Sequence, residues 1–166
     1  YFGSFVVESI SINKPKYLSL NEEYNLYITD FGYINTEKNI HIAIEIDEPY
    51  TIKEKKPIHF KNDERNDFFI NNNWIVIRFA EEQIALYPNL CCDFIKHVID
   101  CIDEASINLI TPITKLPKIP KFTINNINEM IVNNHRNNYL KEIGCNKYEI
   151  EVLIEDMFGF KADRLR

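Results

Sequence analysis

The stretch from residue 41 to residue 79 constrains the fold of this 166-residue chain most strongly. It holds an alternating strand at residues 40–47, a polar loop, a short helix expected from residue 64 to about residue 71, and an apolar strand at residues 74–79. A crossover of this length between two strands favours parallel pairing within one mixed sheet. The stretch therefore predicts an α/β domain with a mixed central sheet flanked by helices.

Two further strands are expected before this stretch, at residues 5–12 and 24–34, because both segments are rich in β-forming residues. The polar residues 35–39 suit a reversal of the chain. We therefore expect residues 24–34 and 40–47 to form an antiparallel hairpin.

Three carboxylates fall near one end of this predicted hairpin. Side chains alternate between the two faces of a strand, so Glu45 and Asp47 should share one face. On the adjoining strand, Asp30 ends a face that is otherwise apolar. Alternation of this kind is also typical of a half-exposed strand whose acids only face water. The pattern by itself leaves a metal site and a solvated surface as alternatives.

The second half of the chain reads as helices around a proline-rich segment. Glu81 opens a short helical turn, and an amphipathic helix is expected from Leu90 to about residue 106. Three prolines exclude regular structure from residues 111–122. Thr123 is a plausible N-cap, with Phe122 and Ile127 placed as a hydrophobic staple, for one helix that passes Arg136 and ends at Gly144. The expected division is a core at residues 1–110, a linker at 111–122 and a helical C-terminal extension at 123–166.

Composition limits the classes of protein that fit. With 45% hydrophobic and 27% charged residues the chain is globular, and the net charge of −6 argues mildly against nonspecific binding to polyanions. The four cysteines match no zinc motif, which favours reduced, mostly buried thiols in a cytoplasmic protein. No membrane span or signal peptide is visible. Because the sequence starts at Tyr1 and not at Met, we expect further domains to precede it.

The order and spacing of several residues resemble the PD-(D/E)XK nuclease superfamily. The nearest branch is the one related to very-short-patch repair endonucleases and the compact DUF559-type nucleases. The resemblance spans about residues 24 to 95, through a hairpin acid, an acid-x-acid pair, an acidic helix start with arginine, and a strand ending in Arg-Phe. In this chain these landmarks are Asp30, Glu45, Asp47, Asp63, Arg65, Trp74, Arg78 and Phe79.

Three positions depart from the pattern of that superfamily. Thr29 stands where the family has proline before the hairpin acid, and Asp63 is one place out of step with the D-x-x-R-like helix start. Asp47 stands where many members have a lysine, a departure that the same branch shares. Activation of water would then depend on the metal or on another residue.

The resemblance implies a restriction-endonuclease-like fold with a site for Mg²⁺ or Mn²⁺. Asp30, Glu45 and the backbone carbonyl of Ile46 are the expected metal ligands, and Asp47 would be a ligand or would orient the water. Phosphodiester hydrolysis needs a nucleophilic water, neutralised phosphate charge and a stabilised leaving oxygen, all of which a hard divalent cation supplies. Clustered carboxylates without a cation would repel one another and raise each other's pKa.

Basic residues near the acids are candidates for binding the substrate. His59 could act as an acid–base group at the scissile phosphate, as a histidine does in related nucleases, or could be an ordinary exposed or core histidine. Lys53, Lys55 and Lys56 could bind phosphate or replace the missing lysine; solvated loop charge is their alternative. Arg65 could hold the DNA backbone or form an internal ion pair.

The resulting prediction is a metal-dependent endonuclease that hydrolyses DNA phosphodiester bonds, as one domain of a larger protein, with DNA as its partner. The first alternative is a catalytically inactive module of the same fold that binds nucleic acid or a protein. The second is an unrelated interaction domain whose acids lie on the surface. Convergence of the carboxylates of Asp30, Glu45 and Asp47 is the observation that separates these alternatives.

Overall fold

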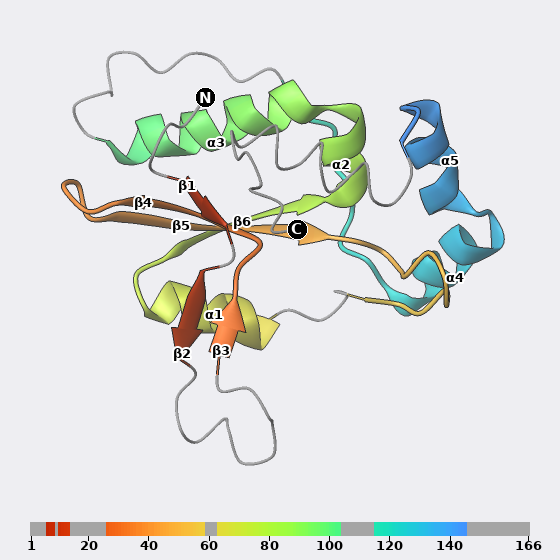
Figure 1. Cartoon of the computed structure of the whole chain (residues 1–166), viewed down its shortest axis with the longest axis horizontal. Coiled ribbons are helices and arrows are strands. Elements are labelled where there is room, and N and C mark those ends of the chain that lie inside the picture. Colours follow the sequence, from red (N-terminus) through yellow and green to blue (C-terminus); the bar gives the residue numbers. More distant parts are fainter. Residues whose placement is uncertain (1–5, 9, 14–25, 59–62, 104–114, 146–166) are drawn as a thin grey trace, which may run out of the picture. The chain divides into compact units, whose positions relative to one another are not determined.

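A computed structural model describes five stretches of the chain, namely residues 6–8, 10–13, 26–58, 63–103 and 115–145 (Figure 1). The described chain is mixed α/β and divides into two compact units, which we describe separately. The sheet unit comprises Ser4–Glu45 and Asn62–Arg78. The helical unit comprises Tyr1–Gly3, Ile46–Lys61 and Phe79–Arg166.

A four-stranded mixed sheet carries the predicted hairpin, with β1 (Val6–Glu8), β4 (Phe31–Asn35), β5 (Ile40–Asp47) and β6 (Ile75–Ala80) in the order β1-β4-β5-β6. Both β1 and β5 pair antiparallel to β4, and Phe31 lies opposite Ile44 in the β4–β5 register. Figure 1 shows β5 and β6 running in the same direction. The prediction of a mixed central sheet is therefore confirmed.

The prediction of single strands at residues 5–12 and 24–34 is wrong, because each segment breaks into two. The second part of the first segment, β2 (Ser11–Asn13), pairs with the first part of the second segment, β3 (Leu26–Ile28). They form a separate two-stranded antiparallel ribbon. Where the chain passes from one sheet to the other, the amide of Thr29 donates to the carbonyl of Ile10 at 3.0 Å. The backbone bends at Asp30, so the alternation expected from residue 24 to Asp30 stops before the acid.

The turn at residues 36–39 and the strand after it are as predicted. Asn39 has a φ of +51°, a left-handed conformation that asparagine tolerates, and the amide of Lys38 donates to the side chain of Asn35 at 3.1 Å. Strand β5 is buried on both faces through most of its length. The alternative of a half-exposed strand with solvated acids is therefore wrong for Glu45, whose side chain is 1% exposed.

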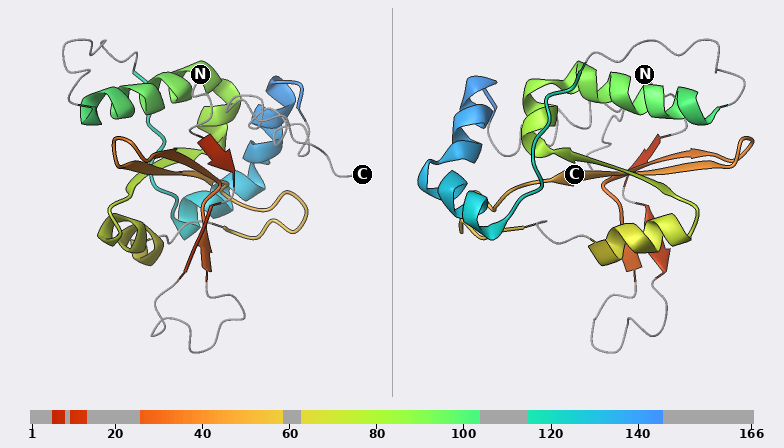
Figure 2. Two further views of the ribbon diagram at one scale, coloured as in Figure 1. Left: turned by 60° about the vertical axis from the view of Figure 1, so that its left-hand side comes forward. Right: turned by 180° about the vertical axis from the view of Figure 1, so that it is seen from behind.

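Helix α1 (Asp63–Asn71) covers one face of the sheet through two phenylalanines. Phe68 and Phe69 pack with Ala43 of β5, and the rings of Tyr27 and Trp74 extend this cluster. Figure 2 shows α1 and the β2–β3 ribbon on the same side of the sheet. Ile70, the next residue of α1, is 57% exposed.

In the helical unit, α2 (Glu81–Leu86) and α3 (Pro88–Ile102) follow the last residues of β6. The predicted long helix is present but begins at Pro88, which suits a first helical position because it needs no amide partner there. Cys91, Cys92 and Ile95 are its buried residues, and Phe94 contacts Phe79 edge to face. All four cysteines are free thiols.

Residues 115–122 have no regular structure, as the prolines predict, and lead into α4 (Ile124–Val132). The Thr123 side chain accepts from the amide of Asn126, which confirms the N-cap. Phe122 and Ile127 belong to one buried cluster, which confirms the staple and includes Tyr50 and Ala80.

The prediction of one helix from Thr123 to Gly144 is wrong, because the chain forms α4 and then α5 (His135–Glu142). Asn134 breaks the helix with a φ of +51°, and the next positive φ, +72° at Gly144, follows the end of α5. Asparagine and glycine enter this conformation at low cost. The new direction of α5 is what brings Arg136 to its partners.

Some expectations fall outside the described residues, namely those for His59, for residues 104–114 and for the segment after Cys145. The proposed division at residues 110 and 122 stays a prediction. Among the helices that the structure describes, none is long and apolar enough to span a membrane.

Candidate functional site

Asp30 and Glu45 lie at the same end of the β4–β5 hairpin. Asp30 forms the bend directly before Phe31, and Glu45 directly follows Ile44, the partner of Phe31 in the register. The charge of Asp30 raises the pKa of Glu45. The two acids are therefore near enough for their charges to interact, and the convergence of all three carboxylates on one metal ion stays a prediction.

Arg65 of α1 closes over Glu45. Its Nη2 atom donates to both carboxylate oxygens of Glu45 at 2.8 Å, and its Nε atom donates to Oε1 at 3.3 Å. The same guanidinium also donates to the carbonyl of Ile28. Arg65 therefore forms an internal ion pair, which was one of its two expected roles.

Burial and charge act against each other on the Glu45 carboxyl. Burial raises its pKa to about 7, Arg65 acts in the lowering direction, and Asp30 adds to the rise. Arg78 of β6 also lowers the pKa, while its Nη1 atom donates to Asn66 of α1 at 3.1 Å. The effect of burial therefore outweighs that of the two arginines on this carboxyl group.

Asp30 and Glu45 carry the oxygen atoms that a hard cation takes as ligands. Mg²⁺ is usually bound by one or two carboxylates and keeps several waters. Both oxygens of Glu45 already accept hydrogen bonds from Arg65. The described stretches contain no cluster of three or more His, Cys, Asp or Glu arranged to hold a metal. Asp47 and Ile46 continue β5 beyond Glu45 and belong to the helical unit. The roles expected for these two residues stay predictions.

The lysines expected to bind phosphate lie on the loop after β5. This loop is closed by a bridge between Tyr50 and Pro57. The Nζ atom of Lys55 donates to Asn134 at 3.0 Å and lies 5.1 Å from the centre of the Tyr50 ring. Lys56 pairs with Glu54 at 2.7 Å, and Lys53 is exposed. Internal contacts thus account for two of the three lysines.

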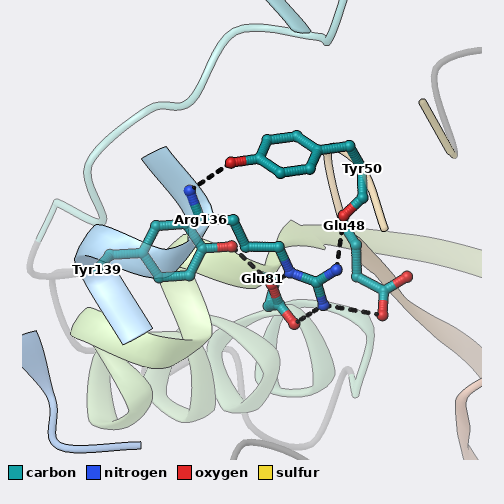
Figure 3. A network of polar contacts seen from close by, with 5 residues as sticks. All are labelled: Glu48, Tyr50, Glu81, Arg136 and Tyr139. Atoms are coloured by element: carbon teal, nitrogen blue, oxygen red, sulfur yellow. Dashed lines mark hydrogen bonds and ion pairs between the residues drawn. The ribbon is translucent and has the colours of Figure 1, made fainter. Parts of the chain in front are cut away.

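A second cluster of buried charge, which was not among the predicted sites, lies in the helical unit (Figure 3). Arg136 of α5 donates from Nε to Glu81 Oε2 at 2.6 Å and from Nη2 to Glu81 Oε1 at 2.5 Å. Its Nη1 atom donates to the carbonyl of Tyr50 at 2.6 Å, and its Nη2 atom also contacts Glu48 at 3.3 Å. The side chains of Arg136 and Glu81 are both 2% exposed.

Two tyrosines complete this network. The hydroxyl of Tyr139 donates to Glu81 at 2.6 Å. The hydroxyl of Tyr50 accepts from the amide of Arg136 at 2.8 Å and donates to the carbonyl of Met130 at 3.3 Å. Burial, together with the charge of Glu81, raises the pKa of Tyr139, so this phenol stays protonated and remains a donor. The network joins α5 to α2 and to the start of the loop after β5.

A weak sequence signal for Arg136 did exist. It precedes Tyr139 and Leu140 by three and four residues, so all three share one side of a helix. Tyr139 and Leu140 are buried, which places an arginine on an apolar stripe. A buried arginine requires a partner, but the spacing cannot name that partner.

Comparisons of the chain with protein-family models, with curated proteins and with solved structures found no match. The assignment of function therefore rests on the residues and their geometry.

Proposed function

We propose that the chain is a metal-dependent nuclease that hydrolyses DNA phosphodiester bonds. The observation that supports this proposal is the buried Glu45 at one end of the β4–β5 hairpin, where the charge of Asp30 acts on it. Natural proteins rarely bury a carboxylate next to a second one unless a cation, a proton or a function compensates the cost.

The topology of the sheet agrees with the resemblance that the sequence suggested. Strands β1, β4 and β5 are antiparallel neighbours, and α1 then crosses to β6, which runs in the direction of β5. In such a sheet, Glu45 from β5 and Asp30 from the bend before β4 would supply oxygen ligands. Arg65 projects from α1 beside them and offers a guanidinium that fits phosphate.

Each residue then has a definite task. Asp30 and Glu45 would hold a Mg²⁺ or Mn²⁺ ion, which supplies an activated water and neutralises phosphate charge. Arg65 would hold an oxygen of the substrate phosphate. Lys53, exposed on the loop after β5, would add affinity for the DNA backbone without reading sequence. Lys55 and Lys56 would contribute less, because they already have partners in the chain.

Cleavage of plasmid and of short oligonucleotides in Mg²⁺ or Mn²⁺ tests the proposal. Asp30→Asn and Glu45→Gln keep the shape of each side chain while removing its charge, and each should lower the cleavage rate by at least roughly 100-fold. Glu37→Gln is the matched control, because Glu37 lies exposed in the turn of the same hairpin. Equal rates in all four proteins would assign the cleavage to a contaminant.

A second function is favoured by the contact between Arg65 and Glu45. Since Arg65 occupies both oxygens of Glu45, the fold could serve as a nuclease-like module that binds nucleic acid without cleaving it. Fluorescence anisotropy with labelled DNA and RNA distinguishes the two functions. Binding without cleavage under every metal condition would support the module, and loss of cleavage alone in Glu45→Gln would support the nuclease.

A further inference from the structure

We infer that Arg65 is a built-in competitor of the metal ion, which occupies Glu45 until a phosphate of the substrate draws it away. Metal loading and DNA binding would then promote each other. This inference rests on the proposed nuclease function and adds to it a mechanism that prevents the chain from loading metal in the absence of substrate.

The geometry of the pair carries the first step. Both oxygens of Glu45 accept hydrogen bonds from one guanidinium, at 2.8 Å each from Nη2, so a metal ion approaching this carboxylate meets a positive charge on its two ligand atoms. Like charges at such distances repel strongly where water is scarce. A divalent ion therefore has to displace Arg65 before it can use Glu45 as a ligand.

The second step follows from which partner can move. Glu45 is fixed in the interior of β5 and is 1% exposed, whereas the Arg65 side chain is 23% exposed and projects from α1. Rotation of the long arginine side chain toward solvent is possible without disturbing the sheet. It would break the bonds to Glu45 and to the carbonyl of Ile28. The arginine is thus the mobile half of the pair.

The third step concerns what replaces the lost contacts. Phosphate accepts the same paired N–H donors from a guanidinium as a carboxylate does. Transfer of Arg65 from Glu45 to a DNA phosphate therefore exchanges one bidentate partner for another. The exchange leaves Glu45 unpaired and buried near Asp30, a costly state that a metal ion relieves. DNA would accordingly prepare the site for the metal, and the metal would free Arg65 for DNA.

Thermodynamic linkage makes this coupling measurable and reciprocal. Couplings between sites typically change affinity by about 5- to 150-fold. The test measures Mn²⁺ affinity by electron paramagnetic resonance at pH 8. Each protein is titrated with and without a phosphorothioate duplex that resists cleavage. Because phosphate can also ligate the metal directly, the contribution of Arg65 is the difference in coupling between wild type and variant.

Three variants sharpen the measurement. Arg65→Gln removes the competing charge and should bind Mn²⁺ at least about fivefold more tightly than wild type without DNA, with a smaller gain when DNA is added. Arg65→Lys keeps the positive charge but loses the paired N–H donors of the guanidinium. Its Mn²⁺ affinity should lie between those of wild type and Arg65→Gln. This variant also allows the test if Arg65→Gln fails to fold. Lys96→Gln is the control, since it removes a cation that pairs with Asp100 within α3, and should leave the coupling unchanged.

The outcomes separate the inference from the function on which it rests. Wild type that binds Mn²⁺ and cleaves DNA, with the same metal affinity and coupling in both Arg65 variants, would overturn the inference and leave the nuclease standing. Absence of Mn²⁺ binding in wild type and in the Arg65 variants, with or without DNA, would overturn both. Tighter metal binding in Arg65→Gln with no cleavage by wild type would support the competition and reject the nuclease.

Discussion

Two buried glutamate–arginine pairs in this chain show how similar ion pairs can have different roles. Glu81 receives three donors from Arg136 and Tyr139, and Arg136 has further acceptors at Tyr50 and Glu48. Glu45 has one arginine that is partly open to solvent and a second carboxylate, Asp30, beside it. We call Glu81–Arg136 the closed pair, because each of its two charges is buried and fully hydrogen-bonded within the protein. We call Glu45–Arg65 the incomplete pair, because its arginine is partly exposed and could exchange Glu45 for another acceptor.

The largest expected effect tests the closed pair. Arg136→Met leaves Glu81 buried without its cation, so the free energy of unfolding should fall by about 3–5 kcal/mol. Urea unfolding followed by circular dichroism measures the loss. The double variant Arg136→Met with Glu81→Leu removes both charges and should recover a large part of it. A loss under about 1 kcal/mol in the single variant would mean that the pair does not hold α5 in place.

The pH dependence of stability tests the incomplete pair. The folded-state pKa of Glu45, about 7, lies above its ordinary value of 4.5, so the folded protein binds more protons than the unfolded chain between these values. Binding of this proton adds to the free energy of unfolding. The added stability is fully present below pH 4.5 and is lost as pH rises through 7, and it amounts to roughly 3 kcal/mol at most. Glu45→Gln cannot titrate and serves as the reference at each pH. A constant difference in unfolding free energy between wild type and variant, or one that grows with pH in favour of wild type, would contradict the prediction.

A smaller effect is expected from the phenol that completes the closed pair. Tyr139→Phe removes the donor to Glu81 at 2.6 Å and nothing else of similar size. Hydrogen bonds to charged groups contribute about 1.5–3 kcal/mol, so the thermal midpoint should fall measurably in calorimetry. Tyr87→Phe, at a tyrosine that is 37% exposed, is the control and should leave the midpoint unchanged.

The smallest effect on stability is expected from a surface lysine that belongs to neither ion pair. Lys55→Ala removes the contacts of Lys55 with Asn134 and the Tyr50 ring, and exposed contacts of this kind contribute less than about 1 kcal/mol. Affinity for DNA, measured by anisotropy, should fall more after Lys53→Ala, because Lys53 is exposed and belongs to the same loop. The reverse order would show that Lys55 leaves its internal partners when DNA binds.

Local pattern predicted the parts of the fold that depend on neighbouring residues. The alternation of β5, the polar turn before it, the start of α1 and the Thr123 cap all follow from rules that act over a few residues. The bend at Asp30 was missed because residues that favour strands lie on both sides of it. The break at Asn134 was missed because asparagine fits both a helix and a left-handed turn.

The sequence allowed us to predict the acidic residues of the candidate site but not their partners. The hairpin register pairs Phe31 with Ile44, which brings Asp30 and Glu45 to the same end of the hairpin, and this register follows from the turn at residues 36–39. The partner of Glu45 was not predictable, because Arg65 lies 20 residues away and could equally have faced solvent. The partners of Arg136 lie 55 to 88 residues away, and local spacing carries no information over that distance.

The Arg136 network also has a consequence for the order of folding. Its hydrogen bonds join residues that are 55 to 88 positions apart in the sequence, whereas the strands of the β4–β5 hairpin are joined by a short turn. Loop-closure entropy makes long-range contacts slow to form, so the hairpin should be structured well before α5 docks. Until then Glu81 and the Tyr50 carbonyl remain hydrated. The late burial of one arginine would thus set the final step of folding, and substitutions at Arg136 should mainly accelerate unfolding.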